Sequence, residues 1–511
     1  MKIFLISPPS NCDDSLPWLE PLGLSYIAAV CRNAGHEVQI RDLLSVYTAD
    51  TAGLFAELDE FEPDLVGLTA MTENFKNGRE IARAVKSRYG CITVFGGWHV
   101  SGEPTVVRDP AIDFLVKGEG EETMLELLEY LEGKIHSPAE IEGLVWLDGD
   151  EVRVNPPRKR IRKLAELPRP VREGLPIEDY KFPMLFCEPV TRMRTLSVQA
   201  SRGCPYTCTF CQTPAIWSNV WSKRTPTDVV DEIEELVARY KFNTLIFRDE
   251  EFTVRKNWVM EICEEMASRG LPKKLKWGSF ARVDDVTPEL VEAMHRGGSR
   301  YVFMGIEATS EEQQEKIKKW YKREQAEEAF ATFRKAGVTT HGSWIIGFPW
   351  DTRAQLDSAF EWLRTLPMDF LSVLYATPFG STLLREEVER NGLLLTDDPN
   401  YFNVNEPAIE VPGIPLEELR SLASHYRNRY FFNPAYMAGV AWQCLKSPTR
   451  ARIVAELFFG SLYRYWHRRK LAGHREQVWG VPPEFFEPHV SYRDVLASMT
   501  HTDLPAAVSG V

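Results

Sequence analysis

Three closely spaced cysteines have the most specific chemistry in this chain. Cys204, Cys208 and Cys211 form a Cys-x3-Cys-x2-Cys run within residues 201–211. Thiolates are soft ligands, so three of them together favour an iron–sulfur cluster or zinc. A zinc site closed by protein needs a fourth ligand, which this segment does not supply. A [4Fe-4S] cluster with one iron open to another ligand therefore fits the spacing better.

The elements that would position these cysteines are short apolar strands alternating with helices. In residues 1–147 this alternation predicts a doubly wound, Rossmann-like α/β domain on a parallel sheet. We expect its first helix at Leu22–Asn33, ending near Gly35 in a left-handed conformation. Ligands of such sheets bind at the carboxyl ends of the strands. The predicted strands are Ile3–Ile6, Val38–Ile40, Leu65–Leu68, Ile92–Phe95 and Phe114–Val116.

A second alternating region, residues 191–390, contains the cysteines and six βα units. Residues 148–190 before it are rich in proline and predict an extended linker. The basic run at residues 156–160 within this linker is typical of a solvated surface. The six predicted strands of the second region are residues 196–199, Thr244–Arg248, Lys276–Phe280, Tyr301–Gly305, Gly342–Ile346 and Leu371–Tyr375.

The remainder, residues 391–511, is predicted to be mainly helical. Ser447 and Pro448 suit the cap and the first position of a helix. Apolar residues then recur at helical spacing beside arginines, which leaves two interpretations open. The helix packs on the preceding domain, the commoner arrangement, or it contacts anionic lipid. The apolar positions are Ile453, Leu457, Phe458, Leu462, Tyr465 and Trp466.

Composition limits the class of protein. The 511 residues have 44% hydrophobic and 26% charged residues, as in globular enzymes, and the net charge of −13 argues against a general nucleic-acid binder. No stretch approaches the roughly 20 apolar residues that span a bilayer, and the first residues do not form a signal peptide. The nine cysteines are an odd number and mostly scattered, so we expect a reducing cytoplasmic location, with peripheral contact at the inner membrane face as the alternative.

The cysteine spacing resembles that of the radical S-adenosylmethionine (SAM) enzymes, in which SAM chelates the open iron. The N-terminal part resembles the cobalamin-binding domain joined to many of them, through residues 21–24, 34–38, 96–99 and 117–121. The resemblance implies a partial (β/α)6 barrel for residues 191–390. No histidine has an aspartate two residues before it, so the Asp-x-His-x-x-Gly motif is absent. We therefore expect no cobalt ligand from that motif.

The resemblance also implies residue roles. The three cysteines hold the cluster with Phe210 against it; Asp249 and Glu250 accept the SAM amino group; Ser279 and Arg282 contact its ribose and carboxylate. Glu307 adds a polar contact and Gly347 a backbone contact to adenine. The alternative for the N-terminal turns is ordinary turn glycines and a surface histidine. The residues expected at cobalamin are Thr69, Thr72, Gly96, Gly97, His99, Gly118, Glu119 and Gly120.

The reaction implied by the resemblance is methylation of an unactivated carbon by two SAM molecules. One methylates cob(I)alamin, and the other yields a 5′-deoxyadenosyl radical through the cluster. Within the family the chain resembles the hopanoid C-3 methylase and the group of anaerobic magnesium-protoporphyrin IX monomethyl ester cyclase and bacteriochlorophyll methylases. We expect a large apolar substrate, hopanoid or tetrapyrrole, and an electron donor such as flavodoxin or ferredoxin. Oxidative cyclisation is the alternative, whereas a cobalamin sensor is disfavoured by the intact cysteine triplet.

Overall fold

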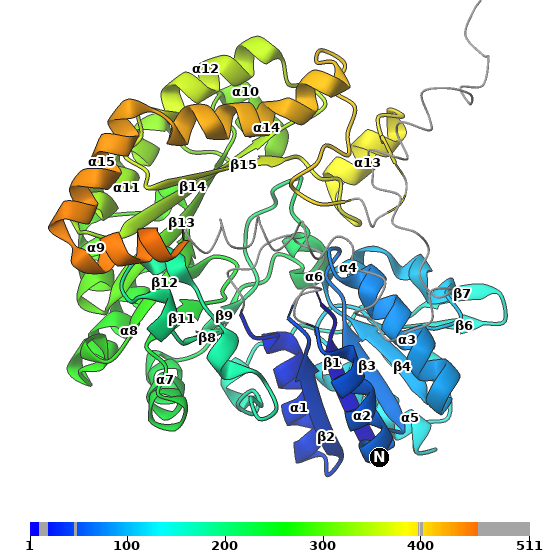
Figure 1. Cartoon of the computed structure of the whole chain (residues 1–511). Coiled ribbons are helices and arrows are strands. Elements are labelled where there is room, and N and C mark those ends of the chain that lie inside the picture. The colour runs from blue at the N-terminus through cyan, green and yellow to red at the C-terminus, as the bar shows by residue number, and fades with distance from the viewer. Residues whose placement is uncertain (10–18, 45–48, 397, 399–401, 458–511) are drawn as a thin grey trace, which may run out of the picture.

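The computed structural model describes residues 1–9, 19–44, 49–396, 398 and 402–457. Two α/β units stand side by side in it, each with its own sheet (Figure 1). The N-terminal unit is blue to cyan in Figure 1, and the second unit is green to yellow. Both predicted α/β regions are therefore confirmed, and each is built on parallel strands.

The N-terminal sheet has the order β2-β1-β3-β4-β5-β6-β7, in which β1 to β5 are parallel. The chain moves to opposite sides of β1 to form β2 and β3, so the topological switch point lies beside β1. All five predicted strands are present. The bounds are β1 (Lys2–Ser7), β2 (Glu37–Asp42), β3 (Leu65–Thr69), β4 (Ile92–Gly96) and β5 (Phe114–Val116).

Helices cover both faces of this sheet. The first helix has the predicted bounds, and Gly35 after it has φ +91°, the left-handed conformation expected there. The helices are α1 (Leu22–Asn33), α2 (Thr51–Phe61), α3 (Phe75–Tyr89), α4 (Trp98–Gly102) and α5 (Glu121–Leu131).

An antiparallel hairpin that the sequence did not predict extends the sheet beyond β5. It consists of β6 (Leu144–Asp148) and β7 (Glu151–Val154). The expected domain boundary at residue 147 falls inside this hairpin.

The second sheet has six parallel strands in sequential order, β8-β11-β12-β13-β14-β15. This is the predicted partial (β/α)6 barrel. Its strands are β8 (Thr195–Val198), β11 (Thr244–Phe247), β12 (Lys276–Ala281), β13 (Ser299–Glu307), β14 (Thr339–Ile346) and β15 (Phe370–Tyr375). Its helices are α7 (Pro226–Tyr240), α8 (Lys256–Ser268), α9 (Pro288–Arg296), α10 (Glu311–Ile317), α11 (Arg323–Lys335), α12 (Arg353–Leu363) and α13 (Leu383–Arg390).

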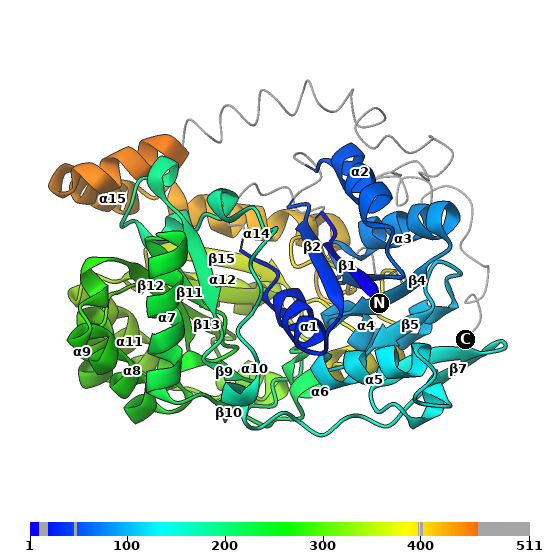
Figure 2. The ribbon, with the colours of Figure 1, turned by 90° about the horizontal axis from the view of Figure 1, so that it is seen from below.

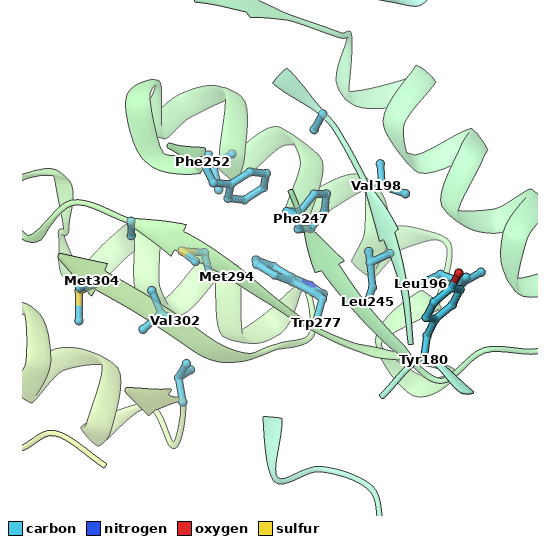
Figure 3. Packing of buried hydrophobic residues seen from close by; sticks show 14 of the residues in the cluster. Tyr180, Leu196, Val198, Leu245, Phe247, Phe252, Trp277, Met294, Val302 and Met304 are labelled. Carbon is cyan, nitrogen blue, oxygen red and sulfur yellow. The ribbon is translucent and has the colours of Figure 1, made fainter. Parts of the chain in front are cut away.

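The outer face of the barrel packs on these helices and forms the main core. Phe247 stacks on Phe252 at 4.4 Å, and Trp277 meets Phe247 edge-on at 5.1 Å (Figure 3). The inner face carries Ile246 and Tyr301, which belong to a separate apolar cluster with Phe182. Side chains alternate between these two faces along each strand.

The C-terminal region is helical where it is described and packs on the barrel. In α14 (Leu416–Phe431) Tyr426 lies 5.1 Å from Trp344 of β14, and α15 (Pro434–Lys446) follows. The predicted cap at Ser447 is confirmed, because its hydroxyl accepts a hydrogen bond from the Arg450 N–H. Ile453 is fully buried, whereas Phe458, Leu462, Tyr465 and Trp466 lie outside the described residues. None of the described helices has the length and apolar character to cross a membrane.

The expectation that the basic linker is solvated was wrong. The side chains of Arg158 and Arg160 are only 11% and 8% exposed, and they pair with Glu122 and Glu119 of the N-terminal unit. The charged partners are distant in sequence, so the run of basic residues alone could not reveal them.

A buried charge pair covers the edge of β8, the first barrel strand. Glu20 accepts hydrogen bonds from the backbone N–H and the hydroxyl of Ser197, while Arg172 donates to the Ser197 carbonyl at 2.7 Å. The Arg172 and Glu20 side chains are 1% and 0% exposed and lie 3.3 Å apart. Arg172 also lies 3.5 Å from Glu232 of α7. The N-terminal unit and the linker thus satisfy an otherwise open strand edge.

Removing one partner of this pair should destabilise the protein strongly. Arg172→Ala leaves the Glu20 charge buried without its cation, which costs about 3–5 kcal/mol of unfolding free energy. Arg296→Ala, which breaks the exposed pair with Glu292, is the control and should cost less than about 1 kcal/mol. Urea denaturation followed by tryptophan fluorescence measures both; equal midpoints for the two variants would contradict the assignment.

His341 on the inner face of β14 predicts an acid-sensitive barrel. Tyr301 and Ser372 each lie 2.8 Å from a ring nitrogen, and burial lowers the His341 pKa from 6.5 to about 4. Folding therefore favours the neutral form of His341. The contribution of neutral His341 to the free energy of unfolding is complete above pH 6.5 and is lost as the pH falls through 4. The loss amounts to roughly 3 kcal/mol. His341→Gln should flatten the decline of the denaturation midpoint between pH 7 and 4, whereas exposed His136→Gln should leave that decline unchanged.

Candidate active site

The cysteine loop follows the short hairpin strand β9 (Ser201–Arg202), which pairs with β10 (Ser222–Lys223). Gly203 has φ +85°, and a Cβ there would lie 2.1 Å from the Val220 carbonyl oxygen, so only glycine fits. The Thr213 N–H donates to the Cys211 sulfur at 3.4 Å, and the Thr213 hydroxyl lies 3.1 Å from that sulfur. These groups would stabilise a negatively charged thiolate.

The three thiols belong to one electrostatic group. Burial, together with the charges of Glu251 and the other two cysteines, raises the pKa of Cys204 to about 12. Burial also raises the pKa of Cys208 and Cys211. Such thiols need a bound cation to become thiolates at neutral pH. Iron would supply that charge.

The described residues contain no ready-made site for a single metal ion. Across the described ranges, no three Cys, His, Asp or Glu side chains converge on a point that could hold one ion. A mononuclear zinc site requires such convergence. In a [4Fe-4S] cluster each cysteine binds a different iron, so the sulfurs stay apart.

The carboxylates after β11 hold the start of the cysteine loop. Asp249 is 1% exposed, and its two oxygens accept hydrogen bonds from the Ser201 hydroxyl and the Ala200 N–H. Both carboxylate oxygens of Asp249 thus hold the start of the cysteine loop, and its contact with the SAM amino group stays a prediction. Glu250 accepts from the Gly203 N–H at 2.9 Å but remains partly exposed, so its SAM contact stays a proposal.

Ser279 lies on β12 and Arg282 directly follows this strand, and the two side chains have different surroundings. The Arg282 guanidinium lies 3.8 Å from the ring centroid of Tyr206 in the cysteine loop. Ser279 lies on the helix-facing side of β12, with Trp277 and Ala281, because Gly278 between them faces Ile246 and Tyr301 on the inner side. Strand alternation turns the Ser279 side chain away from the barrel interior, and its buried hydroxyl has no partner among the described residues, so its ribose contact stays a prediction.

Glu307 reaches the barrel interior through an irregularity in β13. The register with β14 shifts between Gly305 and Glu307, and Glu307 has φ +62°. Its carboxylate accepts a hydrogen bond from the Ser343 hydroxyl at 3.0 Å and from the Lys319 ammonium at 3.2 Å. A left-handed conformation is costly for a side-chain-bearing residue, which marks this position as functionally constrained.

Sequence reasoning missed Lys319 and Arg248. Lys319 is 8% exposed, and its positive charge lowers the pKa of Cys208 and Cys211. The segment KIKK at residues 316–319 has the composition of a surface run and gave no signal. Arg248, directly after β11, is exposed, and burial of its surroundings lowers its pKa.

The turn after β14 binds its own aspartate. The N–H groups of Gly347 and Phe348 both donate to Asp351, whose pKa burial raises to about 6. These N–H groups are therefore occupied, and the carbonyl of Gly347 remains for the proposed adenine contact. Phe210 packs edge-on against Phe348 at 6.2 Å and thus ties the cysteine loop to this turn.

His99, at the carboxyl edge of the N-terminal sheet, has a hydrogen-bond partner among the described residues at only one of its two ring nitrogens. Thr69 ends β3, and the Thr72 hydroxyl after it lies 3.2 Å from His99 Nδ1, while His99 stacks on Phe75 at 4.2 Å. His99 is 2% exposed and its buried Nε2 has no partner among the described residues. Burial lowers its pKa to about 4, so it is neutral. His99 is not a surface histidine, and its Nε2 suits a bound polar group.

The glycines at this edge divide into two kinds. Gly97 and Gly118 have φ +111° and +80°, and they bend the chain away from β4 and β5. Gly96 ends β4 itself. Gly120 packs inside, where a Cβ would lie 3.1 Å from Ile27 of α1. Gly120 therefore contributes packing, and so does Gly97, where a Cβ would lie 2.7 Å from the Ala70 carbonyl oxygen. At Gly118 the nearest atom to a Cβ would be the Ile216 oxygen at 4.0 Å, so this turn leaves room for a ligand.

Glu119 joins the two units. Its oxygens lie 3.0 Å from Arg202 and 2.7 Å from Arg160, and it accepts from the Ile161 N–H at 2.8 Å. Arg202 precedes the cysteine loop directly and also pairs with Glu121. Arginines distant in sequence occupy the Glu119 carboxylate, and its cofactor contact stays a prediction.

The chain after the cysteines packs on the carboxyl edge of the N-terminal sheet. Trp217 of α6 (Thr213–Trp217) lies 6.4 Å from Trp98 of α4, and the two helices are neighbours in Figures 1 and 2. Gln212 donates to the Gly380 carbonyl after β15 at 3.1 Å. A Cβ on Gly102 would lie 2.8 Å from the Gln212 amide nitrogen and 2.9 Å from the Gly380 oxygen. The candidate cluster and cobalamin sites therefore face each other.

Family models match both halves of this arrangement. The B12 binding domain matches residues 16–128, and the radical SAM superfamily matches residues 198–363. The first match includes the carboxyl-edge turns around His99, and the second includes the cysteine loop and the barrel up to α12.

Relatives and solved structures have the same organisation. An uncharacterized methyltransferase of Pyrococcus horikoshii is 30% identical over 85% of this chain and 93% of its own length. The anaerobic magnesium-protoporphyrin IX monomethyl ester cyclase of Cereibacter sphaeroides is 27% identical over 87% of this chain and 74% of its own. The radical SAM methyltransferase TsrM of Kitasatospora setae shares the fold, with a TM-score of 0.68, 20% identity, and coverage of 85% of this chain and 90% of TsrM. This chain belongs to the cobalamin-dependent radical SAM methyltransferase family.

Proposed function

We propose that this protein methylates an unactivated carbon of a large apolar substrate, either a hopanoid lipid or a tetrapyrrole. The observation that carries the proposal is the packing of Gln212 and α6 on the turns of the N-terminal sheet. This contact joins the segment after the cysteine loop to the carboxyl edge of the N-terminal sheet, beside which the cluster and cobalamin would lie. A carbon that is not nucleophilic must be within reach of both the radical and the methyl donor if it is to be methylated.

When bound, the cluster and one SAM supply a hydrogen-abstracting radical, while cobalamin and a second SAM supply the methyl group. Cys204, Cys208 and Cys211 hold the cluster. Lys319 and Arg282 supply the positive charges suited to the SAM carboxylate. Glu250 and Glu307 supply acceptors suited to its ammonium group. An external electron donor, such as flavodoxin or ferredoxin, is required.

Aromatic residues on the inner barrel face favour an apolar substrate. Phe280 and Phe303 lie 5.5 Å apart, and Phe303 lies 4.8 Å from His341. Phe280 and Phe303 are partly exposed, so they line open space in the barrel. The hopanoid C-3 methylase of Methylococcus capsulatus, 27% identical over 82% of this chain, supports the hopanoid alternative. Bacteriochlorophyllide d C-12(1)-methyltransferase of Chlorobaculum tepidum supports the tetrapyrrole alternative.

A second candidate function is oxidative ring formation. The similarity to the cyclase of Cereibacter sphaeroides over 87% of this chain favours it. Ring formation would use the same cysteine loop but would transfer no methyl group.

Isotope labelling separates the two reactions. The reconstituted protein is incubated with trideuteromethyl SAM and with hopanoid or tetrapyrrole acceptors, and products are analysed by mass spectrometry. Methylation should add three deuterium atoms to the product. Cys208→Ala should abolish product and iron content while retaining cobalamin, whereas Cys444→Ser on α15 should retain all three. A product without deuterium would contradict methylation and favour ring formation.

Lys319 should be needed for SAM binding. Lys319→Met removes the ammonium paired with Glu307, so SAM affinity should fall by about 10- to 100-fold. Exposed Lys316→Ala, three residues earlier, should leave SAM affinity unchanged. Equilibrium dialysis with SAM and a parallel iron assay measure binding separately from cluster content. Unchanged SAM affinity with an intact cluster would show that Lys319 has no part in the site.

A further inference from the structure

Helix α15 has an unusual distribution of polar and apolar side chains. None of its residues is buried. Met437, Trp442 and Leu445 are 53%, 58% and 79% exposed. Ala438 and Ala441 between them are also exposed, so the spacing i, i+1, i+4, i+5 and i+8 places all five on one helix face. We call these five residues the α15 apolar face.

The opposite side of α15 makes the contacts with the barrel. The Tyr436 hydroxyl donates to the Asp369 carbonyl at 2.7 Å, and the Gln443 amide donates to the Asp369 carboxylate at 3.5 Å. A surface helix normally buries its apolar side and exposes its polar side. On α15 the barrel-facing side carries apolar Tyr436 and Val440, and the exposed side is apolar as well, which indicates a partner for the exposed side.

The position of α15 leaves this face accessible to a large surface. In Figures 1 and 2 the helix lies at the outer edge of the barrel, away from the N-terminal unit. Phe432, just before the helix, is 72% exposed and extends the apolar region. Across the described ranges, no residue covers these side chains.

Local charge identifies the kind of partner. The chain has a net charge of −13, yet residues 419–455 contain no aspartate or glutamate. Four of the six cations of this stretch pair with acids: Arg420 with Glu417, Arg429 with Glu361, Arg450 with Asp369 and Arg452 with Glu456. Lys446 is exposed beside the apolar face, with its ammonium 4.6 Å from the Trp442 ring centroid. The six cations are Arg420, Arg427, Arg429, Lys446, Arg450 and Arg452.

We propose that the α15 apolar face docks on an anionic lipid surface. Tryptophan, phenylalanine and leucine favour the interfacial region of a bilayer, and each basic residue near anionic headgroups contributes about 1 kcal/mol. The face is limited to one helix, so it lies on the membrane and does not span it. This inference does not depend on the proposed reaction, since it uses only the surface of α15.

Vesicle cosedimentation of the full chain tests the proposal. The protein should bind vesicles of phosphatidylcholine with phosphatidylglycerol, and binding to pure phosphatidylcholine should be weaker. The double variant Trp442→Glu/Leu445→Glu should lower the partition coefficient by about tenfold or more. Val154→Glu, at an exposed apolar position of β7, is the matched control and should bind as the unmodified chain does.

Two further measurements distinguish other occupants of the face. Light scattering after size exclusion should give the same oligomeric state for the double variant and the unmodified chain; a dimer lost in the variant would assign the face to a second copy and overturn the proposal. Absence of binding to anionic vesicles would overturn it, as would binding unaffected by the double variant. Circular dichroism verifies that each variant is folded.

Discussion

Buried contacts between carboxylates and arginines hold the two α/β units in one arrangement, and the candidate site depends on them. Glu119 contacts Arg202 immediately before the cysteine loop, and Glu20 with Arg172 satisfies the edge of β8. These charges are nearly inaccessible to water, so each must keep its partner. The need to keep these partners fixes the N-terminal sheet, the linker and the first barrel strand relative to one another. The distance between the two cofactor sites follows from that constraint.

The same contacts explain why several acidic residues are structural. Asp249 and Glu119 are at strand ends, where ligand contacts are expected, but protein donors occupy both. Their effect on chemistry is indirect, through the position of the cysteine loop. Lys319 and Glu307 instead form a buried pair in the barrel, and Glu307 points inward because β13 departs from a regular register.

The barrel interior and the surface of α15 both suit an apolar substrate. Aromatic side chains line the inner face, while α15 presents apolar side chains outward with cations nearby. A protein that handles a hydrophobic molecule benefits from both features. The interior would hold the apolar body of the substrate, and the surface would bring the protein to the phase in which such molecules dissolve.

The sequence by itself determined the two α/β units, eleven strands of the parallel sheets, the first helix and the cluster cysteines. Hydrophobic periodicity and the Cys-x3-Cys-x2-Cys spacing are local signals, and local signals suffice for these features. The β6–β7 hairpin, the inward turn of Glu307 and the outward direction of Ser279 required strand register. Lys319, Arg160 and Glu119 required knowledge of partners tens of residues away. Only the tertiary structure decided these roles, because ion pairing depends on proximity in space and not on position in the chain.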